Sequence, residues 1–359
     1  MAGAGRGFRK EANCVRGTSA LRISALLVAT FVLAAAAAPG ERAFDPAGTP
    51  DPAPWTGVPA DDASTLRFAV IGDRTGLARP GVFERAVAQV DLMQPEFLIN
   101  VGDLIEGYTR DPAELAEEWS HIEGAIGSLR VPFFYVAGNH DLGNDVMLSA
   151  WKAKRGEPYY QFVFKDVLFL VLDTEDPPRD MPPGLAAQFH QMAAGMKSDP
   201  AATEKALAKY LGQVNADREK GNPGDPEMAA LGAARFSQQQ VDFALKALAD
   251  HRDVRWTFVL MHKPAWKLKS AEFAKIEAAL ADRPYTVIAG HNHYYAYEKR
   301  NGRDYLTMGT AGAISHQHGP GEMDHIAWVT VKDGPPDIAL IKLDGLLDRT
   351  GDSGQTLAR

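Results

Sequence analysis

The stretch Tyr285-Thr286-Val287-Ile288-Ala289-Gly290-His291-Asn292-His293 places two histidines directly after an apolar run. At a strand end followed by a tight loop, both imidazoles can turn toward one centre, which is how a metal site is built. The glycine allows close approach of the backbone, and the apolar run puts the loop at the edge of a sheet. The alternative is a chance pair of histidines on the surface, and the rest of the chain decides between the two.

Four other predicted strands, over 67–71, 97–101, 132–136 and 256–260, also end in polar residues. The polar clusters, in chain order, are Gly72-Asp73-Arg74-Thr75-Gly76, Gly102-Asp103, Gly138-Asn139-His140-Asp141 and His262-Lys263-Pro264. Ligands of α/β sheets bind at the carboxyl ends of the strands, so all five clusters are expected to converge on one crest. A Gly-Asp turn or one packed histidine has an ordinary structural explanation, but five clusters in this order favour a site.

Residues 66–345 alternate predicted strands and helices, which indicates one α/β domain. A helix with one apolar stripe is expected over 81–94, and Asp111-Pro112 should cap and begin a second. The alternation of predicted strands and helices stops over 176–235, which contains two Pro-Pro pairs and Ala-rich helical stretches. A structureless loop of that length is improbable, so we expect a helical cap inserted into the core.

The strands expected elsewhere are paired by turns. Tyr160–Phe164 and Val167–Leu172 should form an antiparallel pair, and two hairpins should turn at Asn301-Gly302 and Asp333-Gly334. Helices are expected after Ser237 and near Ser270. Residues 346–359 form a polar tail.

The N-terminus indicates export. Basic residues precede an uncharged apolar run over 23–38 that ends in alanines, so residues 1–38 are predicted to be a cleaved secretory signal peptide; an uncleaved anchor is the alternative. A Pro-rich linker is expected over 39–65. The lone Cys14 lies in the segment to be removed, so any metal must be held by oxygen and imidazole nitrogen. The sequence also lacks an N-glycosylation sequon, which favours a periplasmic or secreted bacterial protein.

The charge of the mature chain limits its partners. Removal of residues 1–38 leaves 33 basic and 45 acidic residues, a net charge of about −12 with His neutral. An acidic surface repels polyanions, so nucleic acid is not expected as a bulk partner, nor is stable membrane association once the signal peptide is cleaved. A small molecule is the expected substrate.

The order Gly-Asp, Gly-Asp, Gly-Asn-His-Asp, His and Gly-His-x-His resembles the calcineurin-like metallophosphoesterase superfamily, over roughly residues 66 to 310. The resemblance implies an α/β fold: a four-layer α/β/β/α sandwich of two mixed β-sheets flanked by helices, here with the helical insertion. It also implies a two-metal site. The implied ligands are Asp103, which bridges both ions, Asn139, His262 and His291 at one ion, and Asp73 and His293 at the other. His140 would lie by the scissile bond, with Asp141 orienting its imidazole.

The chemistry of phosphate esters accounts for such a site. Two divalent ions ~3.5–4 Å apart neutralise the anionic ester and generate hydroxide from bound water near neutral pH. A shared carboxylate such as Asp103 allows the ions to lie that close. His140 can supply a proton or charge stabilisation to the leaving alkoxide. Oxygen and imidazole ligands favour two divalent or trivalent ions among Mn, Fe and Zn, without choosing between them.

The first motif departs from the family. The family's Asp-x-His is here Asp73-Arg74-Thr75, so one histidine ligand is missing. Purple acid phosphatases also lack it and use a tyrosine three residues after the second motif's aspartate, a position held here by Glu106, with Tyr108 two residues further on. Either Glu106 or Thr75 compensates, or the first site binds metal weakly; a solvated loop carboxylate is the ordinary explanation of Glu106. The Arg74 guanidinium could instead reach the substrate phosphate.

The sequence therefore predicts an exported, metal-dependent phosphoesterase in which metal-bound hydroxide attacks phosphorus and His140 assists the leaving group. Two alternatives stay open. The substrate could be a phosphodiester rather than a monoester. The chain could also be a catalytically weak binding or scaffold protein of the same fold, in which loss of the first-motif histidine has abolished turnover.

Overall fold

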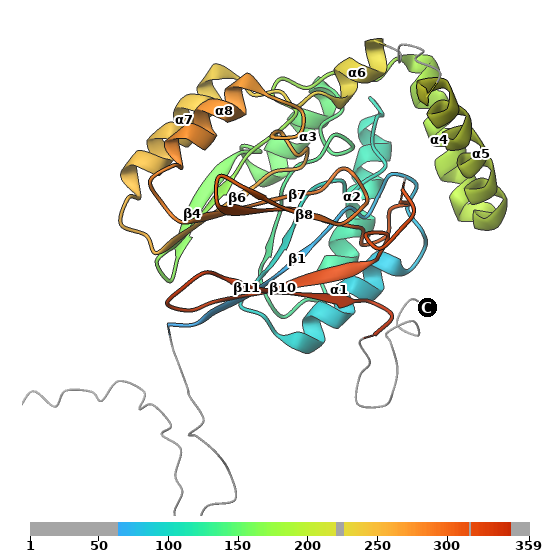
Figure 1. Cartoon of the computed structure of the whole chain (residues 1–359). Helices are drawn as coiled ribbons and strands as arrows, with labels where there is room; N and C mark the ends of the chain where they lie inside the picture. The colour runs from blue at the N-terminus through green and yellow to red at the C-terminus, as the bar shows by residue number, and fades with distance from the viewer. Residues whose placement is uncertain (1–63, 220–225, 316, 346–359) are drawn as a thin grey trace, which may run out of the picture. The chain divides into compact units, whose positions relative to one another are not determined.

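The computed structural model describes residues 64–219, 226–315 and 317–345 (Figure 1). The predicted signal peptide, nearly all of the predicted linker and the polar tail lie outside the described residues, so export stays a prediction. Within the described ranges, every helix is too short or too polar to cross a membrane.

The strands in the described part of the chain form two mixed sheets. The first contains, in spatial order, β11 (Asp337–Lys342), β10 (His325–Val331), β1 (Leu66–Ile71), β2 (Leu98–Asn100) and β3 (Phe133–Phe134). The second contains β4 (Tyr160–Phe164), β5 (Val167–Val171), β6 (Trp256–Leu260), β7 (Tyr285–Ala289), β9 (Arg303–Thr307) and β8 (Ala296–Arg300). Strands β1, β2 and β3 are mutually parallel, and so are β5, β6, β7 and β9. The carboxyl ends of each parallel set therefore lie at one edge of its sheet.

The two sheets pack face to face because their central strands are apolar on both sides. In β1, Phe68 and Val70 enter the core between the sheets, while Ala69 and Ile71 face the helices outside. Phe68 meets Phe169 of β5 edge-on, with ring centroids 5.1 Å apart. A strand covered on both faces is a continuous apolar run rather than an alternating one, as the sequence of β5 illustrates.

Helices cover the outer face of each sheet. The first sheet is covered by α1 (Val82–Met93), α2 (Pro112–Ile126) and α3 (Asp145–Arg155), and the second by α7 (Gln238–Asp250) and α8 (Ala271–Ala279) (Figure 1). Asp111 caps α2 by accepting from the backbone N–H of Ala113, and Ser237 caps α7 by accepting from that of Gln240. The predicted four-layer α/β/β/α sandwich is confirmed.

The segment between β5 and α7 contains α4 (Pro183–Ser198), α5 (Pro200–Glu219) and α6 (Pro226–Gly232). Helices α4 and α5 pack as a hairpin. The segment leaves and rejoins the core at adjacent points, because Glu175 and Arg235 form a parallel bridge and the N–H of Arg235 donates to the carbonyl of Thr174 over 2.8 Å.

Two features differ from the sequence-based expectation. Helix α3 was not predicted, because Met147 and Trp151 alone mark its buried face among charged residues. The strand expected over 132–136 is shortened to Phe133–Phe134. It lies at the edge of its sheet and has one neighbour, so fewer backbone hydrogen bonds extend it.

Candidate metal centre

Polar residues from both sheets meet at the carboxyl ends of the parallel strands. Asp73 and Asp103 follow β1 and β2 of the first sheet, and Asn139 follows β3. His262 follows β6 of the second sheet, and the loop after β7 carries His291 and His293. The site therefore lies between the sheets, and neither sheet supplies all of its residues.

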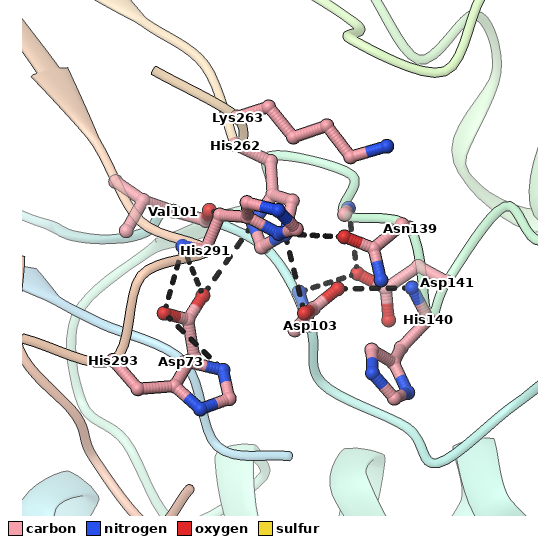
Figure 2. Close-up of polar contacts among 12 residues, drawn as sticks. Asp73, Val101, Asp103, Asn139, His140, Asp141, His262, Lys263, His291 and His293 are labelled. Atoms are coloured by element: carbon pink, nitrogen blue, oxygen red, sulfur yellow. Dashed lines mark hydrogen bonds and ion pairs between the residues drawn. The ribbon is translucent and has the colours of Figure 1, made fainter. Parts of the chain in front are cut away.

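Two groups of ligand atoms form there, each with members within 4.8 Å of one another. One group contains Asp103, His262 and His291, and the other contains Asp73, Asp103 and His293. Figure 2 shows the carboxylates of Asp73 and Asp103 on either side of His262. The structure thus brings together the predicted carboxylates and imidazoles, and Asp103 belongs to both groups.

The atoms of the first group converge closely. His262 Nε2 lies 3.2 Å from Asp103 Oδ2, 3.2 Å from His291 Nδ1 and 3.0 Å from Asn139 Oδ1. Asn139 therefore lies beside this group. Its amide is oriented by Tyr108, whose hydroxyl oxygen accepts from Asn139 Nδ2 over 2.6 Å, so the amide oxygen faces His262. The sequence carried no signal for this role of Tyr108.

Backbone carbonyls select the ring nitrogen that two histidines present. His262 Nδ1 lies 2.9 Å from the carbonyl oxygen of Val101, and His293 Nδ1 lies 2.7 Å from that of Ile314. A carbonyl oxygen can only accept, so each Nδ1 carries the hydrogen and Nε2 is left as the ligand atom. His291 is turned the other way and presents Nδ1 to the group.

The loop after β7 approaches Asp73 through its backbone. The N–H of His291 donates to Asp73 Oδ2 over 2.9 Å, and His293 Nε2 lies 3.9 Å from the same oxygen. A Cβ at Gly290 would lie 2.6 Å from Asp73 Oδ1, so only glycine allows this approach. Both histidines have left-handed backbones, with φ of 71° and 50°, a strained conformation that is typical of functional sites.

Burial and neighbouring charges shift the pKa values of the carboxyl and imidazole groups in the site. Burial raises the pKa of Asp73 to about 8. Although burial opposes the change, the charge of His262 lowers the pKa of Asp103, and the Asp103 carboxylate in turn raises the pKa of His262 to about 9. The buried site thus holds protons at Asp73 and His262 that balance its carboxylates, and bound cations would replace these protons.

The first motif offers one further donor. Thr75 is fully buried, and its Oγ1 has no hydrogen-bond partner among the described residues. Gly76 beside it packs against the ring of His293, since a Cβ there would lie 2.3 Å from His293 Cε1. A buried hydroxyl without a hydrogen-bond partner, in the loop that follows Asp73, would suit an ion held near His293. It would act either as a direct ligand or by binding a water on that ion. The oxygen and imidazole donors of both groups fit hard or borderline divalent ions.

The predicted role of Asp141 is wrong. Its carboxylate accepts from the backbone N–H groups of Gly138, Asp103, Leu104 and Ile105, at 2.9 to 3.2 Å. His140 is held instead by Nδ1, which lies 2.8 Å from the carbonyl oxygen of Glu106, and by its backbone N–H, which donates to Asp103 Oδ1. Asp141 therefore fixes the two motif loops against each other rather than the imidazole.

Glu106 and Arg74 are also placed differently from the expectation. The Glu106 carboxylate accepts from the N–H groups of Ala78 and Leu77, at 2.8 and 3.4 Å, and lies outside both ligand groups of the described residues. Arg74 Nη1 donates to the carbonyl of Leu104 over 2.8 Å. Both side chains brace the loop after β1, because unpaired backbone N–H and C=O groups would be costly so near the buried site.

Known proteins are similar to this chain in sequence pattern and in fold. Residues 66–295 match the family model of calcineurin-like phosphoesterases. A dimetal phosphatase from Danio rerio is similar in structure, with a TM-score of 0.52 and 14% identity over 77% of this chain and 96% of that chain. A purple acid phosphatase from yellow lupin (Lupinus luteus) seeds gives a TM-score of 0.50 and 14% identity over 79% of this chain and 53% of that chain. At such identities these structures show the fold alone. No curated protein matches the sequence.

Proposed function

Because this chain belongs to the calcineurin-like phosphoesterase family, we propose that it hydrolyses small-molecule phosphate monoesters with two metal ions. The observation that carries the proposal is the pair of ligand groups that share Asp103 and draw on both sheets. One ion would be held by Asp103, Asn139, His262 and His291, and the other by Asp73, Asp103 and His293, with Thr75 as a further donor. When bound, two such ions neutralise the phosphate and lower the pKa of water enough to supply a nucleophile near neutral pH.

His140 is suited to assist the leaving group. Its Nδ1 donates to the Glu106 carbonyl, so the ring presents Nε2, for which no partner exists among the described residues. In the imidazolium form Nε2–H can donate to the departing oxygen, and the Glu106 carbonyl keeps the ring in that orientation through the reaction. Its backbone N–H binds Asp103, which ties the position of this proton donor to the ligand shared by both groups.

A phosphoester panel tests the proposal. Purified protein loaded in turn with Mn, Zn or Fe should hydrolyse p-nitrophenyl phosphate faster than bis-p-nitrophenyl phosphate, and chelation should abolish both rates. The reverse preference would favour the phosphodiesterase alternative. We propose the periplasm or the secreted fraction as its location, on the strength of the N-terminal sequence alone.

The His140→Ala substitution separates an enzyme from a binding protein. Loss of a general acid lowers kcat by about a hundredfold or more, while the metal content should stay the same because His140 is not in either ligand group. His121→Ala is the matched control, since the His121 side chain is 60% exposed on α2. If the metal-loaded wild type hydrolysed neither ester and His140→Ala changed nothing, the scaffold alternative would stand.

A further inference from the structure

Helix α4 of the insertion brings an aromatic ring to the proposed proton donor. The ring of Phe189 lies 4.9 Å from that of His140, measured between centroids. Phe189 is partly exposed, so the residues packed around it do not bury it completely. A residue 49 positions away in the chain thus lies beside the group that faces the leaving oxygen.

Tyr108 supplies a second ring at the same place. Its ring centroid lies 4.6 Å from that of His140 and 5.8 Å from that of Phe189. The hydrogen bond of its hydroxyl with Asn139 and a left-handed backbone, with φ of 53°, fix its position. Tyr108 and Phe189 together are called the aromatic wall below; both are partly exposed and both adjoin His140.

The position of α4 is set by contacts with the motif loops. The neighbouring His190 places Nε2 2.9 Å from the carbonyl oxygen of Gly107. A small apolar cluster packs the helix hairpin against Leu77, which follows the first motif, and against Ile314, whose carbonyl binds His293. The insertion residues of this cluster are Phe189, Met192, Ala193, Met196 and Leu207. The wall is therefore a built part of the site.

We propose that the aromatic wall selects phosphate esters whose alcohol portion carries a planar aromatic ring. The inference rests on the proposed function, because the role of His140 fixes the side on which the alcohol portion lies. An aromatic ring attached to the leaving oxygen would stack on Phe189 or meet Tyr108 edge-on. Aromatic pairs are favoured over aliphatic contacts of the same area by an amount that changes a specificity ratio about two- to tenfold.

Two esters isolate this effect. Benzyl phosphate and cyclohexylmethyl phosphate have similar primary alkoxide leaving groups and six-membered rings, and differ in whether the ring is planar. The wild type should show a kcat/KM for the benzyl ester about two- to tenfold above that for the cyclohexylmethyl ester. Phe189→Leu should bring the ratio close to one, and Phe189→Tyr should keep it.

The controls exclude a general effect on folding. Tyr210→Leu removes an aromatic residue of the same insertion that is 54% exposed on α5, and it should leave the ratio unchanged. Thermal unfolding of each variant reports whether the insertion remains folded. Equal kcat/KM values for the two esters in the wild type, or an unchanged ratio in folded Phe189→Leu, would overturn the inference while leaving the hydrolytic function intact.

If the protein hydrolyses neither ester, ligand binding provides a separate test of the aromatic wall. Calorimetry on the metal-loaded protein compares the affinities of two phosphonates, 2-phenylethylphosphonate and 2-cyclohexylethylphosphonate. In both, a CH₂ group replaces the ester oxygen. If neither these esters nor p-nitrophenyl phosphate is hydrolysed, the proposed function is wrong. Tighter binding of the phenyl compound, lost in Phe189→Leu, would still support the wall, and equal binding would overturn it.

Discussion

Asp103 contributes a carboxylate oxygen to both groups of ligand atoms, whereas His291 belongs to one. We expect Asp103→Asn to lose both ions and His291→Ala to lose one, because the neutral amide is a poor bridging ligand. Metal analysis after dialysis measures the stoichiometry. Glu106→Gln is the matched control, since that carboxylate binds backbone N–H groups, and it should retain the wild-type metal content. An Asp103→Asn protein with undiminished metal content would contradict the shared site.

The buried His325, at the start of β10, should make the stability of the fold depend on pH. Burial lowers the pKa of His325 to about 4, and its Nε2 has no partner among the described residues. The unfolded chain takes up a proton below pH 6.5 and the folded protein does not, so stability present at neutral pH is lost as the pH falls from 6.5 through 4. At pH 5 the loss is about 2 kcal/mol.

Urea unfolding at pH 7 and pH 5 measures this loss. His325→Phe keeps a ring against Tyr295, which lies 5.4 Å away, and should reduce the difference between the two pH values by about 2 kcal/mol. His318→Gln is the control, because the His318 side chain is 89% exposed. A pH response of His325→Phe equal to that of the wild type would exclude this residue as its source.

At the scale of elements, the sequence predicts best where the signal is local. The strands β6 and β7 were predicted with their observed limits, since a short apolar run between polar residues defines a strand buried on both faces. The caps of α2 and α7 were predicted because each cap needs only a polar side chain two or three residues before its partner. Helix α3 has a narrow apolar face and was missed for that reason.

The cap of α3 also connects this helix to the site. Asn144 is buried; its Oδ1 accepts from the N–H of Met147 over 3.0 Å, and its Nδ2 donates to the carbonyl of Thr109 over 3.1 Å. We expect Asn144→Ala to lower the free energy of unfolding by about 2 kcal/mol, half from the cap and half from the second bond. Asn144→Ser keeps a capping hydroxyl without the amide donor and should cost about half as much. Chemical denaturation compares them, and equal losses would mean that the cap contributes nothing.

At the scale of the whole molecule, the sequence predicted which residues meet but not how their side chains pair. Parallel strands bring their carboxyl ends together, so the convergence of Asp73, Asp103 and His262 follows from strand order. The partners of Asp141, Glu106 and Arg74 depend instead on which backbone N–H or C=O groups lie within a few ångström of each side chain. These distances arise from the packing of loops that are distant in the chain, and no spacing within the sequence encodes them.

Because each ligand group draws on both sheets, bound ions would hold the sheets together. Ions that bind the folded protein alone stabilise it by about 2.7 kcal/mol per site at a hundred times the dissociation constant. We expect chelation to lower the unfolding temperature by several degrees and added metal to restore it. Differential scanning calorimetry measures this shift, and His291→Ala should show a smaller one. An unfolding temperature that is indifferent to chelator would argue against metal binding between the sheets.

The insertion leaves and re-enters the core at the bridge between Glu175 and Arg235. Segments of other lengths and shapes could be grafted between these two neighbouring positions without altering the order of either sheet or the residues of the metal centre. The metal ligands and Phe189, the residue of the aromatic wall that the insertion supplies, are thus encoded in separate pieces of the chain. One can diverge, or be engineered, while the other is kept.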